Sequence, residues 1–414
     1  MLARLLLLLF LLAGLAIFTA DWRSLRPAAD DVSPAHIAEP RSWLPGSTYV
    51  LRGAARQAGR VWGTDPEAAI ALIRQSTDYY PLDSRHWLDL ARIEASRHGE
   101  LSATLAAHLE AAVAVQPLNR ATRWQAAQIA LHAGDTRLAE HHLQQWLVGA
   151  PGDSTQALFI ARRWLDDPDA LIDRVLPDGD IYLARAMSFA FDQRDMPLAE
   201  AIWQRVNGHV DLDDPILLSY VDFLLARGYH DRAISIWASH DEFFQPGRVA
   251  NGDFSRPLGD DSGLNWRIGR LPAGVRITRD EQDYYYRPAS LRVDFSGDHN
   301  LRLRAPWIRI PVQPSTRYEL SGYWRAETLT TRSLPFWFIE AEGARMRERV
   351  DVPGSRFDWA PWSVTFTVPD DVHMIRLRLR RDSTSAFDRY IDGQLWLDGI
   401  ELTELPLIEP ETDV

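Results

Sequence analysis

Cysteine and lysine are both missing from this chain of 414 residues. The lack of cysteine excludes a disulfide framework, a thiolate zinc site and a cysteine nucleophile. All 45 basic residues are therefore arginine, which also excludes Schiff-base lysine chemistry and a P-loop lysine. The planar fork of arginine suits carboxylate, sulfate or phosphate ligands, although a GC-rich genome produces the same bias.

Positive charge is also scarce, because the net charge is −12. Acidic residues exceed arginines by nine in residues 1–245, the two balance in residues 246–405, and residues 406–414 form an acidic tail. An acidic N-terminal part repels a polyanion. The sequence therefore argues against nucleic acid as a partner.

A long hydrophobic run occurs only near the start, from Leu5 to Ala20 after Arg4. Its length lies between that of a signal-peptide core and that of a full membrane span. Cleavage after Ala20 would place Phe18 where a small residue is preferred, so we favour an uncleaved signal anchor over a signal peptide in residues 1–20. The chain is then a single-pass protein of the bacterial inner membrane, held through residues 5–20 with its body in the periplasm. Cleavage would instead release it into the periplasm.

Residues 21–45 contain four prolines and predict an extended spacer, and residues 46–245 predict a helical repeat domain. In the segment around Gly134, Ala139 follows the glycine by five residues and Pro151 by seventeen. Gly228 and Ala233 repeat this spacing. Glycine ends a first helix, and a small residue lets a second helix approach closely. The pattern resembles the tetratricopeptide repeat, a solenoid that implies a protein partner on its concave side.

Tryptophans and histidines of this helical half could suggest ligand sites, but both have simpler explanations. The tryptophans recur at repeat positions and are expected to pack in the core; they are Trp87, Trp124, Trp146, Trp164, Trp203 and Trp237. His132, His141 and His142 cluster at one hairpin, yet adjacent residues on a helix point apart. We therefore expect neither an aromatic ligand stripe nor a metal site there.

After Phe244 the hydrophobic period changes from helical to two. The expected strands are 290–295, 300–304, 307–312, 317–324, 335–341, 362–368, 374–380 and 395–402. Short polar turns separate them, which is typical of an antiparallel β-sandwich over residues 246–405. The predicted fold class is thus a multidomain α + β chain with an N-terminal membrane segment, a helical solenoid and a C-terminal sandwich.

Motifs spread along residues 248–403 carry a second resemblance. NGDF at 251–254, Trp266, SLRV at 290–293, Tyr318–Arg325, Trp362–Pro369 and the closing WLDGIEL together resemble jelly-roll carbohydrate-binding modules of the galactose-binding-like superfamily. The resemblance implies a non-catalytic sugar-binding sandwich with a structural Ca²⁺ ion, for which Asp253 and Asp398 occupy the matching places. The alternative is that Asp398 caps a turn without an ion.

Alternation along the strands predicts which side chains face outward. The outward set combines aromatic and arginine side chains, and we predict that it forms one glycan site: Tyr323, Arg325, Trp337, Arg376, Arg378 and Trp396. Aromatic rings stack on sugars and arginine forks bind carboxylates, so an acidic polysaccharide is the expected ligand. The alternative is that these arginines are solvated and paired with Asp and Glu.

Catalysis is not expected, because Glu340 and Glu342 are a carboxylate pair without a domain that would form a deep cleft. We predict a cell-envelope adaptor whose repeats bind a protein and whose sandwich binds a glycan, in polysaccharide synthesis or export. The alternative is a purely structural protein–protein scaffold with no sugar ligand.

Overall fold

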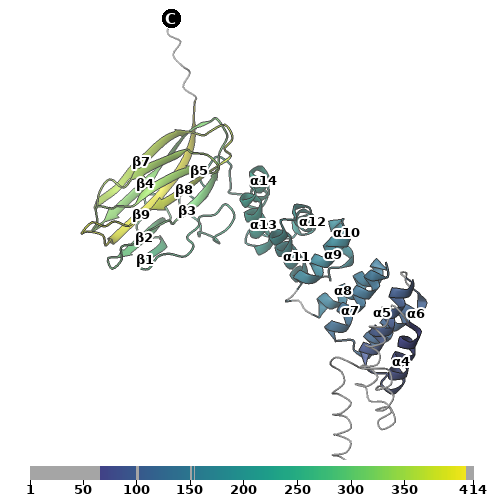
Figure 1. Ribbon diagram of the computed structural model, residues 1–414. Coiled ribbons are helices and arrows are strands. Elements are labelled where there is room, and N and C mark those ends of the chain that lie inside the picture. The colour runs from purple at the N-terminus through teal and green to yellow at the C-terminus, as the bar shows by residue number, and fades with distance from the viewer. Residues whose placement is uncertain (1–65, 99–101, 150–151, 153, 407–414) are drawn as a thin grey trace, which may run out of the picture. The chain divides into compact units, whose positions relative to one another are not determined.

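The computed structural model describes residues 66–406 except 99–101, 150–151 and 153 (Figure 1). The predicted anchor 1–20, the spacer 21–45, residues 46–65 of the predicted repeat domain and most of the acidic tail lie outside the described residues. Within them, none of the helices combines the length and the apolar character that a membrane crossing requires.

The helices occupy the first part of the described chain. They are α4 (Pro66–Tyr79), α5 (Ser84–His98), α6 (Ala103–Val115), α7 (Arg120–His132), α8 (Thr136–Val148), α9 (Thr155–Trp164), α10 (Pro168–Arg174), α11 (Asp180–Gln193), α12 (Met196–Val206), α13 (Pro215–Ala226) and α14 (His230–His240).

The strands follow. They are β1 (Val275–Asp280), β2 (Ser290–Ser296), β3 (Trp307–Pro311), β4 (Arg317–Glu327), β5 (Phe336–Ala341), β6 (Arg347–Asp351), β7 (Phe357–Thr367), β8 (Met374–Arg380) and β9 (Asp392–Leu405). The chain divides into two compact units, Met1–Ile202 and Trp203–Val414.

Helices of the first unit pack as neighbours along the chain, α5 against α6 and α7 against α8. Gly134 has a φ of +78° between α7 and α8, and the Asp135 carboxylate caps α8 by accepting from Leu138 N. The alanines at the predicted close-approach positions, Ala139 and, in the second unit, Ala233, are fully buried. The hairpin geometry is as expected, while membership of the tetratricopeptide family stays a prediction.

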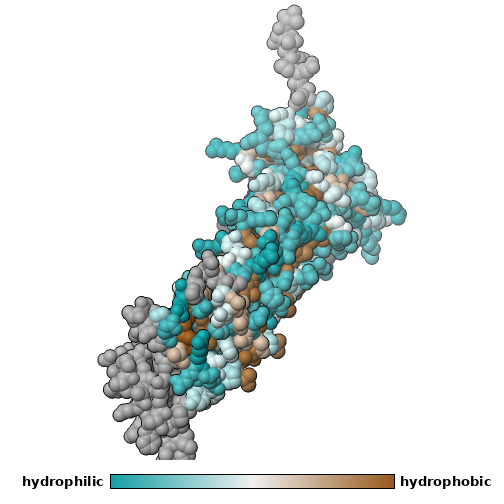
Figure 2. All heavy atoms as spheres, turned by 90° about the vertical axis from the view of Figure 1, so that its right-hand side faces the viewer, coloured by the Kyte–Doolittle hydropathy of each residue, from teal (hydrophilic) through white to brown (hydrophobic). Residues whose placement is uncertain are grey.

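The tryptophans predicted to pack do so in part. Trp146, Trp203 and Trp237 are buried, whereas Trp87, Trp124 and Trp164 are half-buried. On the face drawn in Figure 2 the described residues are mostly hydrophilic, with hydrophobic side chains in small groups. The helices therefore place most of their apolar surface inside the hairpins.

His142 on α8 is buried, and neither of its ring nitrogens has a hydrogen-bond partner among the described residues. Burial, assisted by the charges of His141 and Arg123, lowers its pKa from the usual 6.5 to about 4. A neutral buried histidine stabilises the fold above pH 6.5, and that stability is lost as the pH falls from 6.5 toward 4 because the unfolded chain binds the proton first.

We therefore expect the unfolding free energy of His142→Leu to fall less on acidification than that of the wild type. The difference should reach up to about 3 kcal/mol, at about 1.36 kcal/mol per pKa unit. Urea unfolding followed by helical circular dichroism at pH 7 and pH 4.5 measures this loss. The control is His132→Leu, since His132 is exposed at the end of α7. If the unfolding free energies of the wild type and of His142→Leu depended equally on pH, the acid sensitivity could not be assigned to His142.

The second unit joins the hairpin α13–α14 to a sandwich of two antiparallel sheets. One sheet has the order β1-β2-β9-β4-β7 and the other β3-β8-β5-β6, and their inward side chains fill one core. The predicted C-terminal sandwich is confirmed. The charged strands β1 and β6 were not expected, and residues 300–304 form only an isolated bridge, Leu303 with Arg381.

The loop that begins with NGDF fastens this sandwich to the hairpin. Asp222 on α13 accepts a hydrogen bond from Gly263 N (3.1 Å) and forms an ion pair with Arg267. Trp237 on α14 is fully buried, and a Cβ at Gly263 would lie 1.9 Å from its ring. The change from helix to strand near residue 245 is therefore not the edge of the compact unit, which begins at Trp203.

Gly263→Ala should accordingly destabilise the second unit. Gly263 and Gly269 share a φ of +61°, but a Cβ at Gly269 would meet nothing within 4 Å. Because both variants carry the same backbone cost, the contact with Trp237 should make Gly263→Ala roughly 1–3 kcal/mol worse than Gly269→Ala. Denaturant unfolding of the two variants tests this, and equal losses would refute the packing role of Gly263.

Candidate functional site

The six predicted glycan-site residues do not lie together. Tyr323, Arg325 and Trp396 belong to the five-stranded sheet, because β4 pairs with β7 and β9. Arg376 and Arg378 belong to the four-stranded sheet, because β8 pairs with β3 and β5. Their side chains face outward as predicted, but on opposite sides of the sandwich. The prediction of one combined site is therefore wrong.

Trp337 was predicted to face outward, and this is also wrong. Its side chain is fully buried in the core, together with Ile339 and Ala341. Phe336 occupies the outer side, where the Arg349 guanidinium carbon lies 3.6 Å from its ring centroid. Because both sides of β5 carry large apolar residues, alternation could not decide which side enters the core.

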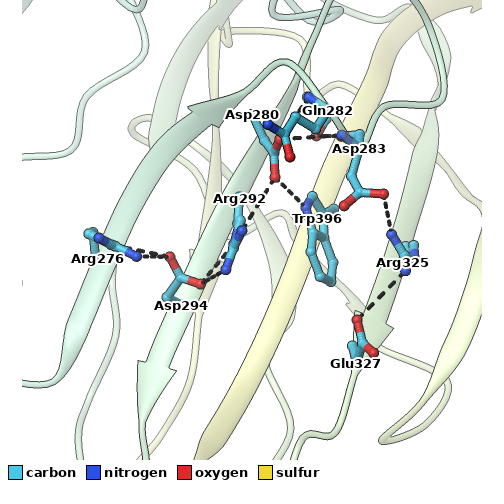
Figure 3. A network of polar contacts seen from close by, with 10 residues as sticks. Arg276, Asp280, Gln282, Asp283, Arg292, Asp294, Arg325, Glu327 and Trp396 are labelled. Carbon is cyan, nitrogen blue, oxygen red and sulfur yellow. Dashed lines mark hydrogen bonds and ion pairs between the residues drawn. The ribbon is translucent and has the colours of Figure 1, made fainter.

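Trp396 faces outward from β9 but is covered. The guanidinium groups of Arg292 and Arg325 lie over its ring, 5.4 and 4.6 Å from the centroid. Its Nε1 donates to Asp280 Oδ2 at 3.0 Å, as Figure 3 shows. Trp396 thus supports the polar network above it and offers no free ring face to a ligand.

That network pairs the arginines of the five-stranded sheet with carboxylates (Figure 3). Arg325 donates to Asp283 at 2.7 Å and lies 3.6 Å from Glu327, while Arg292 bridges Asp280 and Asp294. Burial alone would raise the pKa of Asp280, but hydrogen bonds from Trp396 and two backbone N–H groups outweigh it and lower the pKa. The Asp280 carboxylate therefore stays ionised.

Beside this network, four aromatic residues gather, which we call the tyrosine cluster: Tyr285, Tyr286, Tyr323 and Trp359. Tyr285 stacks on Tyr323 with ring centroids 3.6 Å apart, and Tyr286 stands at 89° to Tyr285. The Trp359 ring lies edge-on, 6.0 Å from Tyr285. Tyr285 and Tyr286 keep 42% and 45% of their surface exposed, so the cluster presents an aromatic corner to solvent.

The closing motif WLDGIEL holds this corner in place. Asp398 Oδ2 accepts from the backbone N–H groups of Tyr285 and Tyr286 at 2.7 and 2.8 Å, and Oδ1 accepts from Gly399 N at 2.7 Å. Gly399 has a φ of +58°, and a Cβ there would lie 2.7 Å from the Tyr286 ring. The carboxylate fixes the tyrosine loop, and the glycine leaves room for the rings.

The expected calcium ligands fit a metal poorly in this arrangement. Both oxygens of Asp398 already accept N–H groups, and Asp253 Oδ1 accepts from the Ser255 N–H and hydroxyl. Burial raises the pKa of Asp398 to about 6, against the effect of its three backbone hydrogen bonds. Calcium takes six to eight oxygens, and no group of three or more His, Cys, Asp or Glu side chains that could hold a metal occurs in the part of the chain that is described. The calcium site stays a prediction.

Sequence reasoning found only Tyr323 of the tyrosine cluster. The signals for its other members were the run YYYR at 284–287 and the dipeptide Asp358-Trp359, both in segments assigned to turns. Polar turns do not ordinarily need consecutive aromatic residues, so such a run between strands indicates an exposed aromatic surface and a candidate site.

No family model matches the chain, and no curated protein matches it. Several solved structures are similar to part of it. A family 16 carbohydrate-binding module shares 16% identity over 34% of this chain and 90% of its own, with a TM-score of 0.24. The CBM22-1 xylan-binding domain from Paenibacillus barcinonensis Xyn10C shares 18% identity over 34% and 85%, with a TM-score of 0.23.

TmCBM61 in complex with β-1,4-galactotriose shares 10% identity over 39% of this chain and 98% of its own, with a TM-score of 0.27. These neighbours are carbohydrate-binding modules. At such low scores the assignment of the sandwich rests on its own sheet topology and core.

The corrected position of Trp337 has a direct consequence for stability. We expect Trp337→Ala to lower the unfolding free energy by roughly 3–5 kcal/mol, since it empties a well-packed site in the core. Phe387→Ala is the control, because Phe387 is fully exposed and its loss should change stability by less than about 0.5 kcal/mol. Thermal or denaturant unfolding would show similar stabilities for both variants if Trp337 were on the surface.

Proposed function

We propose that the C-terminal sandwich binds a glycan at the tyrosine cluster, and that the protein acts as a non-catalytic adaptor of the cell envelope. The observation that carries this proposal is the exposed corner of Tyr285 and Tyr286. Backbone hydrogen bonds to Asp398 order it in advance. A ring that is already held in place loses little conformational freedom when a sugar stacks on it.

The polar rim of the cluster suits sugar hydroxyls. Arg325 reaches Asp283, Glu327 and Asp358, whose side chains are 47%, 41% and 92% exposed. Carboxylates accept hydrogen bonds from hydroxyl groups, and the C–H face of a pyranose packs on an aromatic ring. Since carboxylates outnumber the arginine here, this site favours a neutral sugar and disfavours a uronate.

The remaining parts of the adaptor proposal come from the sequence. Residues 5–20 would anchor the chain in the inner membrane with its body in the periplasm, and the helical unit would bind a protein partner, as repeat arrays do. A groove of about 700 Å³ in that unit, flanked by the exposed Tyr79, Tyr80 and Leu82, supports the partner role. We place the protein in polysaccharide synthesis or export.

We propose no catalytic role. Glu340 and Glu342, the carboxylate pair considered for glycoside hydrolysis, both lie against Arg376, and Glu342 also accepts from Arg309 at 2.9 Å. Both carboxylates are engaged in ion pairs with arginine, so they do not form the free pair that flanks a glycosidic bond in a glycosidase.

The test is binding of the full chain to neutral oligosaccharides, with β-1,4-galactotriose and xylohexaose as probes. Tyr285→Ala should weaken the binding of a recognised sugar by roughly 1–3 kcal/mol, as expected for the loss of a stacking partner. Tyr390→Ala is the matched control, because Tyr390 is exposed to 45% on the loop before β9 and lies outside the cluster.

Titration calorimetry with each variant gives the answer. Equal affinities for wild type and Tyr285→Ala would exclude the cluster as the sugar site. Failure to bind any glycan of a wider panel would favour the alternative, in which the sandwich is a protein-interaction module of a structural scaffold.

A further inference from the structure

The outer face of the four-stranded sheet is the second surface with a distinct chemistry. Strand register places Trp307, Arg378, Phe338 and Arg349 side by side in one row across β3, β8, β5 and β6. The next row contains Arg309, Arg376, Glu340 and Arg347. Arginine and aromatic side chains therefore alternate in the first row, and the second row adds three arginines and one glutamate.

This face carries excess positive charge. Its arginines are Arg309, Arg347, Arg349, Arg376, Arg378 and Arg380, and its carboxylates, with those just beyond the strand ends, are Glu340, Glu342, Asp351 and Asp382. The outer face of the five-stranded sheet has the opposite balance. It carries Arg276, Arg292, Arg317 and Arg325 against Asp280, Asp294, Glu319, Glu327, Asp398 and Glu401. The overall neutrality of the sandwich thus conceals two faces of opposite sign.

Aromatic rings hold the arginine side chains of the positive face in position. The guanidinium carbons of Arg376 and Arg378 lie 5.1 and 5.6 Å from the Trp307 ring centroid, and that of Arg380 lies 4.5 Å from Phe338. Cation–π contacts restrict the guanidinium planes. The forks are therefore ordered before any ligand arrives.

Among the half-buried arginines of this face, Arg378 has the most distant counter-ion. Arg376 shares Glu342 with Arg309 and also contacts Glu340, whereas the ion pair found for Arg378 among the described residues is with Glu340 at 3.8 Å. Burial, and next the charge of Arg376, lower the pKa of Arg378. A half-buried cation with such a distant counter-ion is stabilised by a further anion.

We infer that this face is a second binding site, centred on Arg378, for the carboxylate groups of an acidic polysaccharide. Planar guanidinium forks bind carboxylates in a bidentate manner. Arg378 and Arg349 in one row lie next to three further arginines in the second row, so a polymer that carries several uronates fits the face better than a single small anion. The site is independent of the tyrosine cluster, which lies on the opposite sheet.

The experiment measures binding of the full chain to polygalacturonate, with neutral β-1,4-galactan and monomeric galacturonate as comparison probes. Wild type should bind polygalacturonate in preference to both, and binding should weaken as salt is added because the contact is ionic. Arg378→Gln should reduce affinity about 10-fold or more, the effect of one lost charge-assisted contact.

Arg276→Gln is the control for loss of one positive charge, since Arg276 lies on the opposite face, where it pairs with Asp294 at 3.1 Å. It should bind polygalacturonate like the wild type, and so should Tyr285→Ala, which separates this site from the proposed sugar site. If Arg378→Gln fails to fold, Arg378→Lys replaces it, and it should bind several-fold more weakly because the charge remains but the fork is lost. Unchanged binding in the Arg378 variant, equal loss in Arg276→Gln, or equal binding of β-1,4-galactan would each overturn the inference.

Discussion

The two sheets must fill one common core, and every surface of the sandwich depends on this constraint. Alternate residues of each strand are committed to the interior, where Leu320, Leu377 and Leu397 are fully buried. The other half of each strand is left outside on one of two faces. Packing in the core does not dictate which residue types these outward rows contain. The two outer faces can therefore differ in chemistry and serve separate functions.

On the five-stranded sheet, one buried carboxylate joins the fold to the proposed site. Asp398 leaves β9 on the outer side and accepts the backbone N–H groups of a loop that lies more than a hundred residues earlier in the chain. A buried carboxylate is costly unless its oxygens are satisfied, and here the loop satisfies Oδ2 while Gly399 N satisfies Oδ1. The same bonds turn the tyrosine loop from a polar turn into an ordered aromatic corner.

On the four-stranded sheet, charge pairing dominates. The alternative that arginines on β8 are paired with acidic residues is correct for Arg376, which contacts Glu340 and Glu342. Charge pairing is less complete for Arg378. Absence of lysine matters here, because only a planar guanidinium group can both stack on Trp307 and present a fork to an anion.

Local pattern was enough for much of this protein. The helices, the sandwich and the inward side of β8 and β4 follow from apolar residues at a period of 3.6 or 2, since that period reflects which side of an element meets the core. The buried alanines and the helix-ending glycines could be predicted from local spacing for the same reason.

The features that the sequence could not decide depend on which residues become neighbours when the chain folds. Both sides of β5 are apolar, so only packing against the opposite sheet shows that Trp337 is inside and Phe336 outside. Only strand order separates Arg378 from Arg325, because hydrogen-bond pairing joins segments that are distant in the chain. The loop partners of Asp398 are equally remote in the chain. From the sequence alone its carboxylate could cap a turn, bind a metal or hold a distant loop. Tertiary structure alone shows which donors reach it.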